Sequence, residues 1–218
     1  MIPIRDDNPR RLQPIVTVLF IAINIAVFIY QMTLSQEEYA KFLYAFGAIP
    51  DLIVHGQQLY ATISSMFLHG GIMHIAGNML YLWIFGDNIE GICGHWRFIW
   101  FYLICGIIAF LSHFFLDPFS EIPMVGASGA ISGIMGAYIL RFPRARVHVI
   151  IPLFPLIWIW RSINLPAFIV LGFWILLQVF NAFFAGGGGV AWFAHIGGFL
   201  GGLFLIKFFE KKNYRVKY

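Results

Sequence analysis

Residues 125–133 read Val-Gly-Ala-Ser-Gly-Ala-Ile-Ser-Gly, and they place a serine, Ser128, among small residues at the head of an apolar segment. Small neighbours leave the hydroxyl accessible and let another helix approach closely. Such runs usually serve helix packing in membranes, and a single Gly-Ala-Ser-Gly is too common to indicate chemistry by itself. The rest of the chain must therefore decide between packing and catalysis.

The composition indicates a polytopic membrane protein. The 218 residues are 60% hydrophobic and 11% charged, whereas a soluble domain is about half apolar and about a quarter charged. The net charge of +4 does not indicate nucleic acid, because the charges lie between apolar segments. Two cysteines, Cys93 and Cys105, form no disulfide framework or metal motif. We expect no metal and no cofactor.

Apolar runs predict an all-α membrane protein with six spanning helices. The expected helices are 15–32, about 71–89, 98–116, about 128–140, 166–184 and 190–209. A turn is expected at 91–94. We expect residues 15–209 to form one helical domain, between a polar N-terminal segment, 1–14, and a basic tail, 210–218.

Two stretches between the helices are interrupted by glycine or proline and are not expected to span the membrane. Residues 33–65 are interrupted by Gly47, Pro50 and Gly56. They are predicted to form a structured, partly embedded loop, since irregular backbone at membrane depth must be covered by protein. Residues 147–160 are apolar but short and contain prolines, so we expect them to lie at the membrane interface.

The distribution of basic residues predicts the orientation. With six helices, all but one of the 14 lysines and arginines fall on the side of the termini, and Lys41 alone falls on the other side. Cytoplasmic loops carry the excess of basic residues, so both termini are expected in the cytoplasm.

Polar side chains then fall at one depth. The second, fourth and sixth helices start at the outer face, and their first turns carry His74 and Asn78, Ser128, and His195. These positions lie within roughly 10 Å of the outer boundary. Ionisable groups inside a bilayer are costly and usually face a functional cavity.

Two stripes of glycine accompany Ser128 and His195 on their helices. They would let the fourth and sixth helices approach closely enough for a Ser–His hydrogen bond of about 2.6–3.2 Å. The stripes comprise Gly129, Gly133, Gly136, Gly198 and Gly202.

This set of groups suits nucleophilic catalysis. A serine hydroxyl needs a base to take its proton, and His195 is the candidate. The Ser128 backbone amide, Asn78 and His74 could donate to a developing oxyanion. No acidic residue is placed to orient His195, so a Ser–His dyad is expected. Gln178 and Asn181 on the fifth helix are interpreted as packing amides, and a gating role is the alternative. The alternative for His74 and Asn78 is that they only join helices.

The chain resembles the rhomboid intramembrane serine proteases. Residues 126–129, Gly-Ala-Ser-Gly, match the family's Gly-x-Ser-x motif, and residues 194–202 match its Ala-His-x-x-Gly-x-x-x-Gly motif. His69, His74 and Asn78 match its His-x4-His-x3-Asn pattern. Gly86 and Glu90 fit the pattern at the end of the same helix.

The resemblance implies a six-helix rhomboid bundle that cleaves transmembrane protein substrates within the lipid bilayer. It implies Ser128 as nucleophile and His195 as base, with His74, Asn78, the Ser128 amide and Gly126 at the oxyanion and substrate site. His69 and the glycines would support helix packing. The fifth helix or residues 186–189 would control access.

Two departures from the family pattern stand out. Many members have Trp-Arg in the first loop where this chain has Tyr60-Ala61, and some have an aromatic residue where it has Ser132. Anchoring of the loop and packing of His195 must then come from elsewhere, such as Met135 or a ring on another helix.

Two other functions remain open. One is a catalytically silent rhomboid-like protein that binds membrane helices, and the other is a small transporter using the same polar groups. The compact build favours a bacterial plasma membrane. The sequence does not identify the substrate or the oligomeric state.

Overall fold

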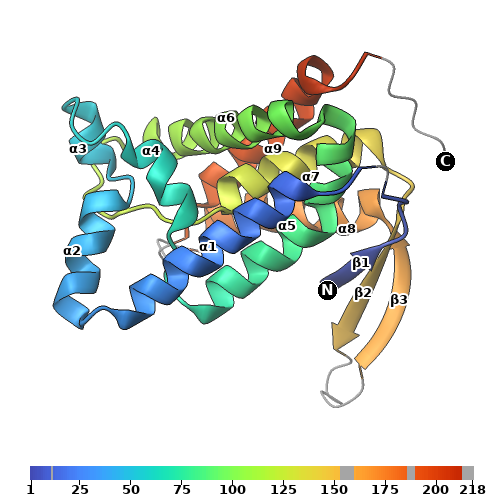
Figure 1. Cartoon of the computed structure of the whole chain (residues 1–218), viewed down its shortest axis with the longest axis horizontal. Helices are drawn as coiled ribbons and strands as arrows, with labels where there is room; N and C mark the ends of the chain where they lie inside the picture. Colours follow the sequence, from blue (N-terminus) through green and yellow to red (C-terminus); the bar gives the residue numbers. More distant parts are fainter. Residues whose placement is uncertain (11, 153–159, 186–189, 213–218) are drawn as a thin grey trace.

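The computed structural model describes residues 1–10, 12–152, 160–185 and 190–212. It is a bundle of helices with a small sheet at one end (Figure 1). The long helices are α1 (Ile15–Thr33), α5 (Ile72–Cys93), α6 (His95–Phe114), α7 (Ser128–Arg141), α8 (Ala167–Phe184) and α9 (Trp192–Phe209). The shorter elements are α2 (Gln36–Phe46), α3 (Pro50–Val54), α4 (Ala61–Ser64) and η1 (Ser65–Phe67), and the strands are β1 (Ile2–Asp6), β2 (Arg146–Pro152) and β3 (Trp160–Pro166).

Each predicted spanning segment overlaps one of the long helices. In the described part of the chain, α1, α6, α8 and α9 are long and apolar enough to cross a membrane. The protein is therefore a mostly helical membrane protein. The predicted turn at 91–94 is wrong in its position, because α5 continues to Cys93 and ends at Gly94, whose φ of +80° suits glycine.

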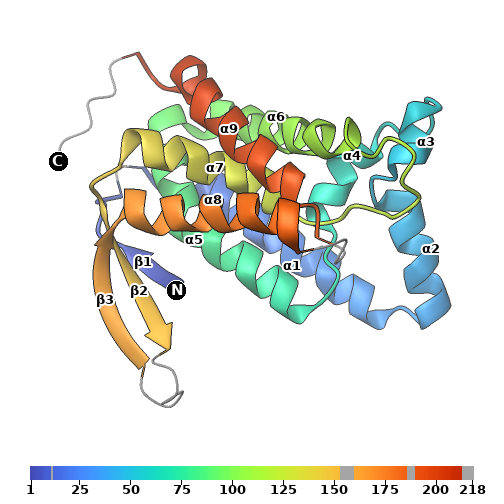
Figure 2. The same ribbon diagram turned by 180° about the vertical axis from the view of Figure 1, so that it is seen from behind.

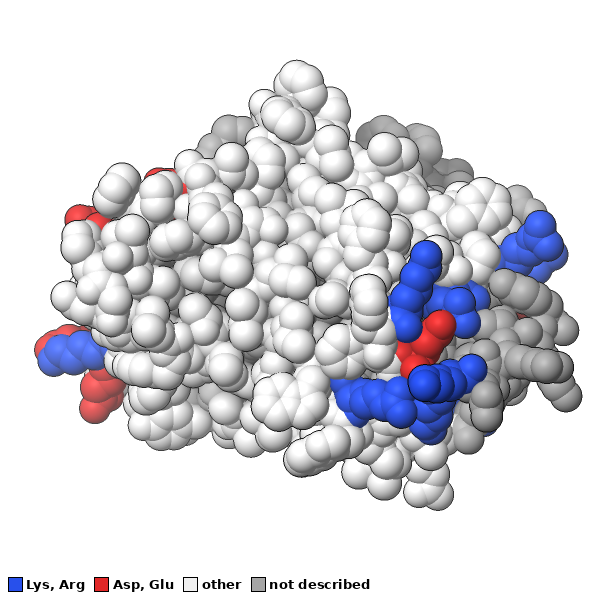
Figure 3. All heavy atoms as spheres, turned by 90° about the horizontal axis from the view of Figure 1, so that it is seen from above, with Lys and Arg blue, Asp and Glu red and all other residues white. Residues whose placement is uncertain are grey.

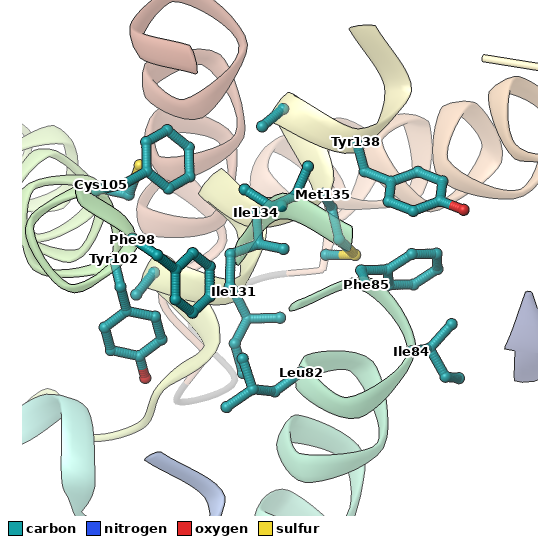
Figure 4. Packing of buried hydrophobic residues seen from close by; sticks show 14 of the residues in the cluster. Leu82, Ile84, Phe85, Phe98, Tyr102, Cys105, Ile131, Ile134, Met135 and Tyr138 are labelled. Carbon is teal, nitrogen blue, oxygen red and sulfur yellow. The ribbon is translucent and has the colours of Figure 1, made fainter. Parts of the chain in front are cut away.

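Helix α7 forms the centre of the bundle. At 14 residues it is only about 21 Å long, and nine consecutive positions, 130–138, are buried. Its side chains pack against α5 and α6 through rings and branched aliphatic groups, as Figure 4 shows. The core residues around α7 include Leu82, Phe85, Phe98, Tyr102, Ile131, Ile134 and Tyr138.

Helices α7 and α9 touch through their backbones. A methyl group at Gly202 would overlap the backbone of Gly133, and one at Gly198 would overlap the carbonyl of Gly129. Gly136 faces the backbone of Phe199 in the same way. The predicted glycine stripes therefore do form the contact between these two helices, because any larger residue would force them apart.

The segment 33–65 is an ordered set of short helices. A capping box between Ser35 and Glu38 starts α2. The Tyr60 hydroxyl donates to the Ala45 carbonyl, and the Ser64 hydroxyl donates to the Phe46 carbonyl. Ala61 is completely buried. These contacts hold the segment together without a Trp-Arg pair, and paired backbone hydrogen bonds between Ala48 and Met124 attach it to the chain that precedes α7.

The three-stranded sheet was not predicted. Its order is β1-β2-β3, with both neighbouring pairs antiparallel. Val147 and Val149 of β2 are fully buried, so the start of the segment expected at the membrane interface packs on the core instead. Residues 153–159, which complete that segment, lie outside the described residues.

Charged residues gather at the two ends of the molecule. The face in Figure 3 has a broad uncharged band between two charged ends, and basic residues dominate the end that carries the sheet in Figure 1. At the opposite end, Lys41 pairs with Glu37 on α2. This pattern agrees with helices that run between two membrane surfaces.

Hydrogen-bonded carboxylates, one buried and one half-buried, hold the sheet end together. Glu90 accepts hydrogen bonds from the backbone amides of Val16 and Thr17 and from the Thr17 hydroxyl, so it caps the start of α1. At the end of β1, Asp6 accepts from the Tyr138 hydroxyl and from Asn88. Both contacts tie the N-terminal segment to the bundle.

We predict that Gly202→Ala lowers the thermal midpoint in detergent by at least about 5 °C, because the new methyl group separates α7 from α9. The matched control is Gly172→Ala on α8, where no described atom lies within 4 Å of an added methyl group. Equal midpoints for the two variants would contradict the close contact.

A second prediction concerns pH. Burial raises the pKa of Asp6 to about 6, so the folded protein binds this proton more tightly than the unfolded chain does. The stabilisation is present at low pH and is lost as the pH rises through 6. Asp6→Asn should therefore raise the thermal midpoint more at pH 8 than at pH 5. A difference that stays constant between these pH values would exclude this role.

Candidate active site

Ser128 and His195 meet at the end of the bundle opposite the sheet. Ser128 is the first residue of α7, and His195 lies in the first turn of α9. The Ser128 Oγ atom is 2.8 Å from the Nε2 atom of His195. The glycine contacts bring the backbones of α7 and α9 close together. Ser128 on α7 and His195 on α9 can therefore reach each other across the helix pair.

A third side chain contacts the imidazole. The Gln178 Oε1 atom on α8 lies 2.9 Å from the Nδ1 atom of His195. The sequence interpretation of Gln178 as a packing amide therefore missed this contact. Neither helix periodicity nor a sequence motif indicates this contact, since Gln178 and His195 are on different helices.

Two tryptophan rings flank His195. The Trp174 ring lies at 5.9 Å between centroids with a tilt of 40°, and the Trp192 ring lies edge-on at 6.0 Å. The ring on another helix that the sequence required is thus Trp174 of α8. Ser132, which stands where some rhomboids have an aromatic residue, donates its hydroxyl to the Ser128 carbonyl at 2.6 Å.

Hydrogen-bond donors surround the start of α7. Gly126 has a φ of +123°, and a methyl group there would lie 2.7 Å from the His74 Nε2 atom and 3.7 Å from the Asn78 Nδ2 atom. The buried Nδ2 atom of Asn78 has no hydrogen-bond partner among the described residues. The Ser128 amide belongs to the first turn of α7, where helical amides have no partner within the helix.

His74 is held in a defined orientation. Its Nδ1 atom accepts a long hydrogen bond of 3.4 Å from the Gly70 amide, which leaves the ring proton on Nε2, toward Gly126. The ring of His69 packs edge-on against it, 5.1 Å away. His69 is completely buried, and the Gln31 amide group bonds both its backbone N–H and its carbonyl.

A cavity of about 840 Å³ contains these groups. Ser128, His195, His74 and Asn78 all line it, together with Gln178. Most of the remaining wall is apolar, so a hydrophobic segment could enter while its peptide bond meets polar groups. Residues 186–189, one of the two segments expected to control access, lie outside the described residues.

The site offers acid–base and nucleophilic chemistry. In the described part of the chain, no group of three His, Cys, Asp or Glu side chains could hold a metal ion. Cys93 and Cys105 are buried free thiols, and neither lines the cavity around Ser128. The reactive groups are thus a hydroxyl next to an imidazole, with amide and imidazole donors nearby.

Several known proteins are similar to this chain in sequence. "Rhomboid protease GluP" of Bacillus subtilis is 35% identical over 125 residues, which cover 57% of this chain and 24% of that protein. "RHOMBOID-like protein 5" of Arabidopsis thaliana is 35% identical over 91 residues, covering 42% of this chain and 29% of that protein. "Rhomboid protein 1, mitochondrial" of Saccharomyces cerevisiae is 27% identical over 168 residues, which cover 71% of this chain and 44% of that protein.

These matches limit what the relatives imply. The chain covers between 24% and 44% of the length of these three proteins. They include a bacterial protein and one named as mitochondrial, so they do not support the expected bacterial plasma membrane. The model of the Rhomboid domain matches residues 56–212, which is most of this chain and includes Ser128 and His195. The chain belongs to the rhomboid family.

Proposed function

We propose that the protein is an intramembrane serine endopeptidase that cleaves transmembrane segments of other proteins. The observation that carries the proposal is the 2.8 Å contact between the Ser128 hydroxyl and the His195 Nε2 atom inside an apolar cavity. A serine is a weak nucleophile unless a base accepts its proton, and this contact supplies the base.

The reaction follows from these positions. The Ser128 Oγ atom attacks the scissile carbonyl carbon while its proton passes to His195 Nε2. The imidazolium then donates this proton to the leaving nitrogen as the carbon–nitrogen bond breaks. Water, deprotonated by the same imidazole, attacks the acyl-serine, and the proton returns to the Ser128 oxygen as the second product leaves.

The oxyanion receives donors from two helices. The Asn78 Nδ2 atom, the His74 Nε2 atom and the Ser128 amide surround the start of α7. Such preorganised donors stabilise the charge that develops in the transition state more than they stabilise the neutral carbonyl. Gly126 keeps the backbone close to both side chains, since a larger residue would contact His74.

The proposed topology gives the substrate a route. Residues 15–209 form the protease domain, and α1, α5, α6, α7, α8 and α9 cross the membrane with both termini on the cytoplasmic side. Segment 33–65 then lies in the outer leaflet, and residues 1–14 and 210–218 are cytoplasmic. The substrates are transmembrane proteins, because a mostly apolar cavity wall suits an apolar segment.

We predict that a serine-directed fluorophosphonate labels the purified protein in detergent and that Ser128→Ala and His195→Ala each abolish labelling. The same variants should lose cleavage of a model transmembrane substrate by at least about 10³-fold. Ser132→Ala is the matched control, because Ser132 lies one turn further along α7 and bonds only the Ser128 carbonyl. It should still label.

Thermal midpoints would show that the variants are folded. Unchanged labelling of Ser128→Ala would refute the proposed nucleophile. Failure of the folded wild-type protein to label or to cleave would favour a rhomboid-like protein that binds helices without cutting them.

The oxyanion assignment gives a separate prediction. Asn78→Ala should lower kcat by less than the roughly 10²–10³-fold seen when a single essential donor is lost, because His74 and the Ser128 amide remain. Asn78→Asp should lower kcat further, since a carboxylate would repel the oxyanion. Kinetics on a model transmembrane substrate measure both effects, and an unchanged kcat in Asn78→Asp would remove Asn78 from this role.

A further inference from the structure

The contact between Gln178 and His195 has a consequence for the chemistry. We propose that Gln178 is a positioning residue, whose side-chain carbonyl holds His195 in the tautomer that can accept the Ser128 proton. This inference rests on the proposed serine protease function and extends it from two residues to three.

The orientation of the Gln178 amide follows from its two partners. Its Nε2 group donates to the backbone carbonyl of Trp174 at 3.1 Å, and a carbonyl can only accept. The amino group must therefore face Trp174, which turns the Oε1 atom toward the Nδ1 atom of His195 at 2.9 Å. A reversed amide would place two acceptors against each other at Trp174.

The tautomer of His195 follows in turn. Because Gln178 Oε1 can only accept, the Nδ1 atom of His195 must carry the proton, and Nε2 presents its lone pair to the Ser128 hydroxyl. The amide then does what the buried carboxylate does in a Ser-His-Asp triad, which is to hold the ring and its tautomer. A neutral amide does this without burying a charge at membrane depth.

The burial of Gln178 supports a specific role. Of the described residues 172–184, Gln178 alone is buried, at 6% exposure, while Leu176, Val179 and Phe180 are exposed. A glutamine with no specific contact would be expected on the exposed side of α8. Figure 2 shows α8 on the outside of the bundle. The Gln178 side chain of this outer helix contacts the His195 imidazole.

Nitrogen-15 NMR tests the tautomer directly, without a substrate. Protein in detergent, labelled with 15N-histidine, should show His195 protonated at Nδ1 and not at Nε2, with the signals assigned by their loss in His195→Gln. Gln178→Met, which keeps the length of the side chain and removes the acceptor, should shift His195 away from this tautomer. A wild-type His195 protonated at Nε2, or an unchanged spectrum in Gln178→Met, would overturn the proposal.

Fluorophosphonate labelling tests the consequence for reactivity. Gln178→Met should lower the labelling rate about 10- to 100-fold, the size of effect that follows loss of a partner that orients a metal-binding histidine. Gln178→Glu keeps an acceptor and should restore labelling at high pH, with the half-maximal pH moved upward because a carboxylate favours the imidazolium. The matched control is Asn181→Leu on the same helix, which should label at the wild-type rate.

The two proposals can fail separately. If the wild-type protein does not label, the serine protease function fails, and the NMR result still decides whether Gln178 orients His195. If the wild-type protein labels and Gln178→Met labels equally fast with the same pH profile, the positioning role fails alone. If Gln178→Met does not fold, the wild-type spectrum and the pH shift of Gln178→Glu decide the question.

Discussion

The backbone contact between α7 and α9 is the constraint on which the rest of the structure depends. Gly129, Gly133, Gly198 and Gly202 let the two helices meet without side chains between them. Any methyl group in this contact would push the helices apart, and the first turns of both would separate with them. The 2.8 Å distance between Ser128 and His195 is a consequence of this packing. In a bilayer, where lipid is as apolar as leucine, such close contact is a main source of helix association.

Polar groups serve opposite purposes at the two ends of the bundle. At the sheet end, two carboxylates are satisfied by protein: the buried Glu90 accepts from Val16 and Thr17, and the half-buried Asp6 accepts from Tyr138. At the other end, the Asn78 amide is buried yet has no partner among the described residues. A satisfied network stabilises a fold, whereas an unpaired donor beside a cavity is available to a ligand. The division separates a paired polar network at the sheet end from an unpaired donor beside the cavity, where we propose that substrate binds.

Hydropathy predicted the long helices, and glycine spacing predicted which helix faces can pack closely. Both signals could be read from the sequence because each is a property of a local segment. Each apolar run contains a helix, and α5 differs from its expected end by only four residues, since the helix continues until Gly94. The sheet was not predicted because its first strand, β1, is separated in sequence from β2 by all the helices from α1 to α7. An isolated apolar stretch such as 147–152 has no local sign of the strand that will pair with it.

The sequence by itself identified the family, because its motifs match those of the rhomboids and the Rhomboid domain model covers residues 56–212. It also predicted a common depth for Ser128, His195, His74 and Asn78, because helix periodicity and bilayer thickness convert residue number into face and depth. Only the tertiary structure decided what surrounds His195. Trp174 and Gln178 are both supplied by α8, and no spacing along the chain relates them to α9. Rotation of one helix about its axis relative to another is set by packing, so contacts between helices become known only when the bundle is assembled.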